Sequence, residues 1–199
     1  MEERKLRILE LAKELFIQFG YSKVSMDMLA SRLGMSKKTL YLSFDSKETL
    51  LIEIVLSFQN RLNKEMEELI SNEEIEFSVK LSSMLTLVAT NFSTISPHFI
   101  EDINRNAPKA WIKVQELKRD AAFHRFSMLI KEGIRMGHIK KDVNQLMAIM
   151  LYASSIDNMF NPAFLAMVPK EMAKELPHSA SIIFEDIIKI IFEGILEKK

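Results

Sequence analysis

The sequence predicts an all-α protein, and three observations support this fold class. Apolar residues recur every three or four positions over most of the 199 residues, which is the spacing of one buried helix face. No segment alternates apolar and polar residues as a half-buried strand would. No proline occurs before Pro97 and the five glycines are dispersed, so helix breakers are few. We expect about nine or ten helices.

The first two helices are defined by their ends. An apolar stripe predicts a helix over about residues 3–19, with Gly20 as its C-terminal stop. Ser25 predicts the start of a second helix, because a serine side chain can accept from the free backbone N–H groups of a first turn. This second helix is expected to end at Gly34.

Serine caps also predict the next two helices. Ser36 precedes a short helix over about 37–43, and Ser46 precedes a long helix that runs to about residue 70. The long helix carries an apolar stripe with steps of four and three: Leu51, Val55, Phe58, Leu62, Met66 and Leu69.

The remaining chain continues in the same pattern. Further helices are expected over about 77–95, 97–106, 108–136, 143–160 and 179–197. The segment NPAFLAMVP, which begins at Asn161, is expected to be an irregular apolar connector.

Composition excludes several classes of function. Without cysteine the chain has no disulfide, thiolate metal site or cysteine nucleophile. The four histidines show no HExxH pattern and no i,i+4 pair, and no P-loop or dinucleotide-binding glycine pattern occurs, so we expect no metal, no cofactor and no enzyme. The charged N-terminus is unlike a signal peptide and no window is apolar enough for a membrane span, so a cytoplasmic protein without membrane contact is expected.

One segment, VSMDMLASRLGMSKKTLYLSFDSKE, carries a functional motif. Ala30, Gly34 and Leu40 have the spacing that lets two helices cross closely around a glycine turn, as in a helix-turn-helix. The second helix of that motif enters the major groove of DNA. Its outward positions here hold lysines and hydroxyls that suit phosphates and base edges. The alternative is a solvated helix that happens to carry these residues.

The charge distribution agrees with a modest nucleic-acid surface. The net charge of the chain is zero, but residues 21–47 hold five Lys or Arg against two Asp or Glu. Such a patch suffices when two subunits both contribute phosphate contacts.

The stretch from Ile8 to Leu51, and most specifically GMSKKTLYLSFDSKETL, resembles the TetR family of bacterial regulators. The resemblance implies an N-terminal DNA-binding domain over 1–48 and a helical ligand-binding and dimerisation domain over 49–199. The sequence departs from the common family pattern at Lys38, Leu42 and Ser43, so the operator sequence does not transfer. The resemblance implies a DNA-binding site with base and phosphate contacts from Lys37, Lys38, Thr39 and Tyr41. It implies Ser25 and Ser36 as backbone-positioning caps of that site and Lys47 as a phosphate contact.

Two C-terminal helices predict a homodimer. The helix over 179–197 is apolar nearly all round, and the helix over 143–160 is similar, whereas a helix with one buried face should be amphipathic. Two such helices per subunit would form a four-helix bundle about a two-fold axis. The alternative is a buried monomer core. The expected interface residues are Met147, Met150, Ile183, Ile187, Ile191 and Ile195.

Methionine and aromatic residues predict an apolar ligand pocket. Residues 49–199 hold nine Met and ten Phe, which suit a cavity for varied apolar shapes but equally an ordinary core. Asn91, Gln115, His124 and Asp157 are polar residues that could orient a ligand. The expected lining is Phe58, Leu62, Met66, Met84, Val88, Phe92, Phe99, Trp111, His124, Phe126 and Met128.

These features predict a transcriptional regulator, most simply a repressor. Its partners would be a near-palindromic double-stranded DNA operator, a small apolar or amphipathic effector and a second copy of the chain. Two alternatives stay open: an apolar-ligand carrier with a non-functional helix-turn-helix, and an activator of the same fold.

Overall fold

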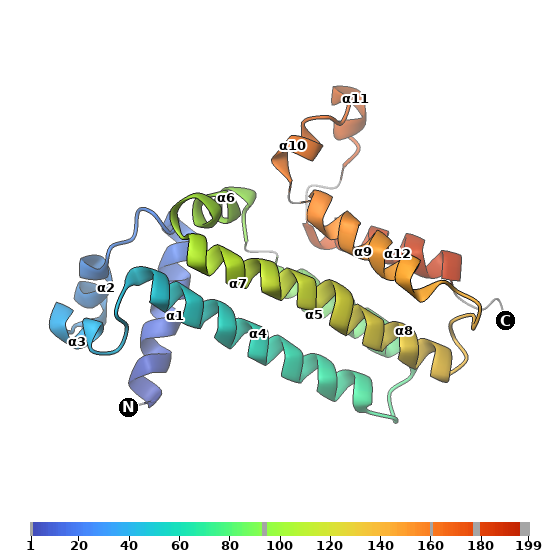
Figure 1. The fold of residues 1–199 in the computed structure, drawn as a ribbon, viewed down its shortest axis with the longest axis horizontal. Helices are drawn as coiled ribbons and strands as arrows, with labels where there is room; N and C mark the ends of the chain where they lie inside the picture. The colour runs from blue at the N-terminus through green and yellow to red at the C-terminus, as the bar shows by residue number, and fades with distance from the viewer. Residues whose placement is uncertain (1, 93–94, 160, 177–179, 196–199) are drawn as a thin grey trace. The chain divides into compact units, whose positions relative to one another are not determined.

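The computed structural model describes residues 2–92, 95–159, 161–176 and 180–195. Within these ranges the regular structure is helical, with no β-strand, so the all-α prediction is confirmed (Figure 1). The chain divides into two compact units. Unit 1 comprises Met1–Leu62 and Ile95–Leu117, and unit 2 comprises Asn63–Thr94 and Lys118–Lys199.

Unit 1 contains the N-terminal helices together with a later segment of the chain. Its core is one apolar cluster in which Phe16, Leu29, Leu40 and Leu50 are fully enclosed. The helices are α1 Glu2–Phe19, α2 Met26–Leu33, α3 Lys37–Tyr41, the first part of α4 Lys47–Ser71, α6 Pro97–Asn106 and most of α7 Pro108–Arg119. The expected ends of the first four helices are correct to within two residues, because these ends depend on local caps.

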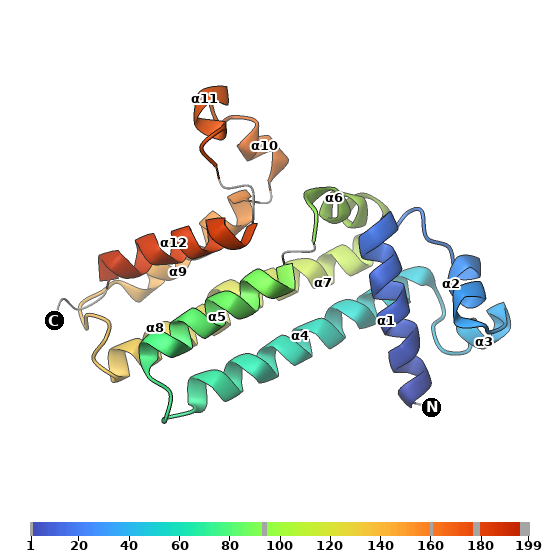
Figure 2. The same ribbon diagram turned by 180° about the vertical axis from the view of Figure 1, so that it is seen from behind.

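Unit 2 has its own core. Phe77, Phe126, Leu129 and Ile130 are buried there, and the ring of Phe126 stacks on Tyr152 with the centroids 4.2 Å apart. Helix α12 packs against α5 and α9, which Figures 1 and 2 show from opposite sides. The helices are the end of α4, α5 Phe77–Phe92, α8 Phe126–Arg135, α9 Gln145–Met159, α10 Pro162–Leu165, α11 Lys170–Ala173 and α12 Ala180–Ile195.

The helix predicted over 108–136 is present without interruption over 108–135, but not all of it is α-helical. Helices α7 and α8 are separated by a π-helix, η1, over Asp120–Arg125. A π-turn holds an extra residue and so rotates the faces of the helix that follow it. In this case Arg125 is buried, and its Nη1 atom donates to Oδ1 of Asn63 at 2.8 Å. Periodicity alone does not reveal such a π-turn.

The connector after α9 is also more regular than expected. It contains α10 and α11, and a proline stands at the start of each: Pro162 is the first residue of α10 and Pro169 is the N-cap of α11. Proline suits a helix start because its fixed φ fits the helix and its missing N–H would be unpaired there.

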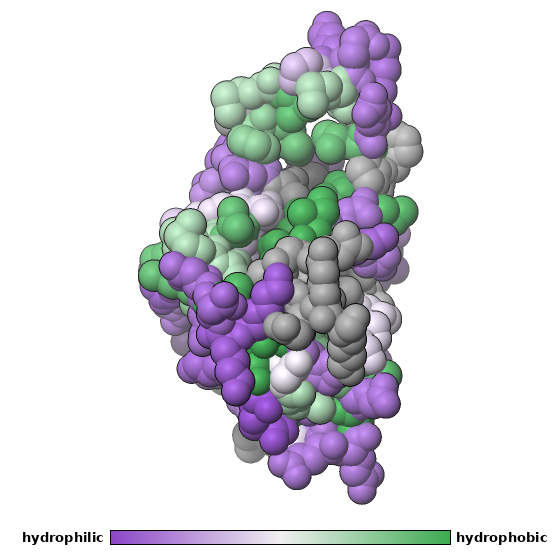
Figure 3. Space-filling view, turned by 90° about the vertical axis from the view of Figure 1, so that its right-hand side faces the viewer, coloured by the Kyte–Doolittle hydropathy of each residue, from purple (hydrophilic) through white to green (hydrophobic). Residues whose placement is uncertain are grey.

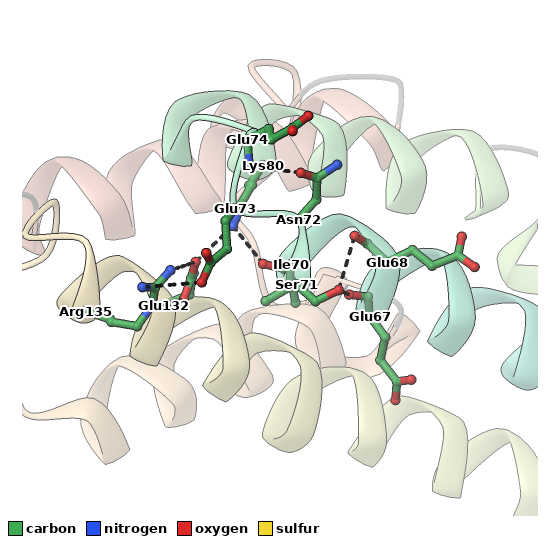
Figure 4. A network of polar contacts seen from close by, with 10 residues as sticks. All are labelled: Glu67, Glu68, Ile70, Ser71, Asn72, Glu73, Glu74, Lys80, Glu132 and Arg135. Atoms are coloured by element: carbon green, nitrogen blue, oxygen red, sulfur yellow. Dashed lines mark hydrogen bonds and ion pairs between the residues drawn. The ribbon is translucent and has the colours of Figure 1, made fainter.

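A buried ion pair joins three elements of unit 2 (Figure 4). Lys80 of α5 is fully buried, and its Nζ atom donates to the carbonyl oxygen of Ile70 at 2.7 Å and to Oε1 of Glu132 at 2.9 Å. Arg135 donates to both carboxylate oxygens of Glu132 at 2.8 Å. The end of α4, the start of α5 and α8 are thereby held together by charge as well as by apolar packing.

Candidate nucleic-acid interface

Two serine caps and one glycine shape the helix-turn-helix in unit 1. Ser25 Oγ accepts from the N–H of Met28 and Ser36 Oγ accepts from the N–H of Thr39, both at 3.1 Å. Gly34 adopts φ +65°, and its N–H reaches the carbonyls that end α2. A left-handed backbone conformation is strained for a residue that carries a Cβ, so glycine is favoured at the turn. The predicted caps are confirmed.

Helix α3 is anchored through its inward side chains. Leu40 is fully buried and Phe44, just beyond the helix, is 4% exposed. The opposite face is open to solvent: Lys37, Lys38, Tyr41 and Leu42 are all exposed. A five-residue helix is thus held by its core contacts while it presents cations, a phenol and one leucine outward.

The polar side chains of α3 differ in their partners. Lys37 Nζ lies 2.6 Å from Oδ1 of Asp27 on α2, and this hydrogen bond raises the pKa of Lys37. Thr39 Oγ1 shares a hydrogen bond with Ser36 Oγ at 2.8 Å. Among the residues that the structure describes, the ammonium group of Lys38 makes no hydrogen bond or ion pair. Lys38 is therefore the cation of α3 that is available to a phosphate or base without breaking another contact.

Lys47 has an internal set of partners at the start of α4. Its Nζ atom donates to the carbonyl oxygens of Tyr21 and Val24, each at 2.9 Å, and lies 4.2 Å from the centroid of the Tyr21 ring. Burial lowers the pKa of Lys47. These contacts tie α4 to the connection between α1 and α2. The phosphate contact expected of Lys47 stays a prediction.

Two carboxylates connect the segments that flank the helix-turn-helix to later helices of unit 1. Asp102 on α6 accepts from both the N–H and the hydroxyl of Ser22, at 3.0 and 3.2 Å. Glu48 on α4 accepts from the N–H of Lys109 at 2.7 Å and so caps the first turn of α7. Pro108 in the sequence indicates that a helix begins there, but no local signal points to either distant carboxylate.

The residues expected to line a pocket fall in both units. Unit 1 contains Phe58, Leu62, Phe99 and Trp111, and its apolar cluster includes Phe99 with Phe58 and Trp111 packed against it. In unit 2 Met66, Met84 and Phe126 share the buried cluster and Met128 packs against it, whereas His124 is exposed. The side chains of Val88 and Phe92 lie outside the described residues. The role of the whole expected set as pocket lining stays a prediction.

The expected dimer residues show two degrees of burial. Met147 is 54% and Met150 44% exposed on α9, whereas Ile183, Ile187 and Ile191 of α12 are half-buried. The side chain of Ile195 lies outside the described residues. Four further apolar residues of these helices are exposed, which the all-round apolar pattern could have indicated: Leu146, Leu151, Ile182 and Ile190. Figure 3 views the side on which α8, α9 and α12 lie in Figure 1, and hydrophobic residues reach the surface there.

Neither a metal site nor a membrane span is evident in the described part of the chain. No three His, Asp or Glu side chains within it are grouped as metal ligands. No helix of that part has the length and apolarity needed to cross a bilayer.

Comparison with known proteins adds an independent finding. Residues 8–54 match the model for bacterial regulatory proteins of the tetR family. A relative, the HTH-type transcriptional regulator YvaF of Bacillus subtilis (strain 168), is 24% identical over 192 residues, which cover 95% of this chain and 94% of YvaF.

Solved structures share the fold over nearly the whole chain. A TetR/AcrR-family regulator from Thermobifida fusca aligns with a TM-score of 0.65 and 21% identity, covering 96% of this chain and 98% of its own. The fatty acid degradation regulator FadR from Bacillus halodurans aligns with a TM-score of 0.67 and 15% identity, covering 96% and 95%. The matched family consists of DNA-binding regulators rather than enzymes.

Proposed function

Since this chain is a TetR-family transcriptional regulator, we propose that it is a homodimeric repressor that a small apolar or amphipathic effector releases from its operator. The observation that carries the proposal is the outward face of α3. This helix is fixed by Leu40 and offers Lys38 and Tyr41 to a partner. A fixed helix with exposed donors suits the major groove, because little order is lost on binding.

DNA binding is tested by its salt dependence. The full-length protein is titrated with duplexes from the DNA next to its own coding region at several salt concentrations. Lysine–phosphate contacts release counterions, so affinity should fall steeply with salt, and Lys38→Ala should reduce the slope. A protein that binds apolar ligands but shows no salt-dependent DNA affinity would instead be the carrier.

Dimerisation through α9 and α12 is the second part of the proposal. The exposed apolar residues Met147, Met150 and Ile190 are supported as contacts because a large apolar surface favours burial between copies. Sedimentation at micromolar concentration should show a dimer that Ile190→Asp converts to monomer. Val79→Asp, at an exposed position on α5, is the matched control and should leave the dimer intact. A wild-type monomer contradicts this part.

Release by an effector requires that the two conformations bind it with different affinity. Helix α4 is a candidate lever because it begins in unit 1 at Lys47 and continues into unit 2. The Asp102 and Glu48 contacts would carry a displacement of α6 or α7 to the connection between α1 and α2 and to the start of α4. An effector that abolishes DNA binding while the two recognition helices keep their separation would contradict this mechanism.

The apolar character of the effector is supported by the Met- and Phe-rich composition of the ligand-binding part. A relative in fold, FadR, is named for fatty acid degradation. Fatty acids are therefore the first compounds to test for release of bound duplex. The position of the operator relative to the promoter distinguishes repressor from activator. A regulator that binds an operator of a bacterial chromosome would act in the cytoplasm.

A further inference from the structure

Leu42 is the most exposed large hydrophobic residue in the described chain, with 76% of its surface open to solvent. It follows the last residue of α3 and belongs to neither apolar cluster. Single exposed leucines are common on protein surfaces and carry no meaning by themselves. The significance of Leu42 depends on where the helix holds it.

Backbone geometry directs Leu42 to the same face as Lys38. The N–H of Leu42 donates to the carbonyl oxygen of Lys38 at 3.0 Å, and Leu42 has helical φ and ψ of −67° and −21°. Residues four apart in such a turn are neighbours on the helix surface. Leu40 and Phe44, on the other side of this turn, are buried and prevent its rotation. The outward face of α3 thus places the Leu42 side chain beside the Lys38 ammonium, which has no partner among the described residues.

We infer that Leu42 contacts the C5-methyl group of a thymine in each half-site of the operator. The inference rests on the proposed function. In the major groove the thymine methyl is the one apolar group that a base pair presents, and the other groups are hydrogen-bond donors and acceptors. A leucine packed on those polar groups would displace their hydrating water without supplying a hydrogen bond in its place. Burying polar groups in this way is unfavourable. Against a methyl group both partners lose only apolar hydration.

The neighbouring lysine supports this occupant over another protein. Lys38 adds positive charge beside Leu42, which attracts the phosphates that line the groove and disfavours burial in an apolar protein interface. Phosphate contacts would set the register of α3, and Leu42 would distinguish thymine from cytosine at one position. The readout needs no hydrogen bond.

The test removes the methyl group and nothing else. Duplexes that bind full-length protein are first selected from a random pool, and each thymine of the selected site is then replaced by deoxyuridine. At one thymine position per half-site, the loss of the methyl should weaken binding about fourfold, the effect of one buried methyl-sized group. In Leu42→Ala the same replacement should have no effect, and the other thymine positions should behave as in wild type.

Matched variants separate the outcomes. Ile112→Ala removes a similarly exposed aliphatic side chain from α7, where 57% of it is open to solvent, and should keep the full deoxyuridine effect. Thermal unfolding of Leu42→Ala should match wild type, because the side chain packs on neither core. The inference is overturned if the deoxyuridine effect persists in Leu42→Ala, or if wild-type protein shows no deoxyuridine effect at any position. In both cases the DNA-binding function still stands. Failure to select any duplex overturns the proposed function, and this inference with it.

Discussion

The carboxylate of Asp102 accepts two hydrogen bonds from Ser22, which precedes it by 80 residues. The connection between α1 and α2 is thereby held by α6, and Gly20 beside it has no Cβ to crowd the carboxylate; an added Cβ would lie 3.0 Å from Oδ2. The compact unit around the helix-turn-helix consequently extends beyond the predicted boundary at residue 48 and includes α6 and most of α7. The division by function at that boundary stays a prediction.

Asp102→Ala should lower the free energy of unfolding by about 2 kcal/mol near neutral pH, because hydrogen bonds to a charged group are lost. Burial would raise the pKa of Asp102, but the hydrogen bonds from Ser22 and Asn106 lower it below its usual value. The stabilisation is therefore complete above the unfolded pKa of about 4 and is lost as the pH falls through the lower folded pKa. Denaturant unfolding of wild type and Asp102→Ala across pH 2–7 measures this difference. Glu101→Ala, on the same helix, is the control and should show no comparable loss of unfolding free energy.

Lys47→Met should destabilise the protein without DNA by about 1–2 kcal/mol, since the carbonyls of Tyr21 and Val24 lose their donor. Lys38→Met should leave the unfolding free energy unchanged and weaken only DNA binding, because the Lys38 ammonium has no partner in the described chain. Denaturant unfolding of both variants, next to their DNA titrations, makes the comparison. If Lys47→Met is as stable as wild type, its contacts with the carbonyls are not stabilising.

Glu132→Gln should cost about 3 kcal/mol, because the fully buried Lys80 loses its counter-charge. Lys80→Met should cost less, since it removes the buried charge and leaves Glu132 paired with Arg135. Hydrogen bonds from Arg135 and then from Lys80 lower the pKa of Glu132 to about 2. Its contribution is thus complete above about pH 4.5 and is lost as the pH falls toward 2.

The control for this network is Glu73→Gln. Glu73 is exposed and lies 4.0 Å from Arg135, so its removal should change stability little. Equal losses in Glu132→Gln and Lys80→Met, measured by urea unfolding, would contradict the argument from buried charge.

Gly133→Ala should destabilise unit 2 by about 1–3 kcal/mol through overpacking. A Cβ there would lie 2.5 Å from Cδ1 of Ile139 and 2.6 Å from Cζ of Phe77, both in the core. Gly137→Ala is the matched control: its φ of +76° adds strain of about 1 kcal/mol, but nothing lies within 4 Å of the added Cβ. Thermal unfolding compares the two variants. A smaller loss of stability in Gly133→Ala than in Gly137→Ala would contradict the packing argument.

Local chemistry made part of the site predictable. Ser25, Gly34 and Ser36 act on backbone groups within five residues of themselves, so their effect is present in the sequence as a pattern. Periodicity likewise indicated that Leu40 turns inward, and α3 therefore presents Lys38 outward. The π-helix at Asp120–Arg125 was not predictable in this way, because the helical sequence around it carries no breaker.

The sequence by itself determined the long helices, the caps of the helix-turn-helix and the outward face of α3, because these follow from interactions between residues three or four positions apart. Tertiary structure alone decided the partners of Lys47, Asp102 and Glu48, which lie 23 to 80 residues from the groups they bind. A charged side chain on a helix surface looks the same in sequence whether it faces water, DNA or another helix. Only the packing of α1, α4, α6 and α7 brings each carboxylate or ammonium within hydrogen-bonding distance of its partner.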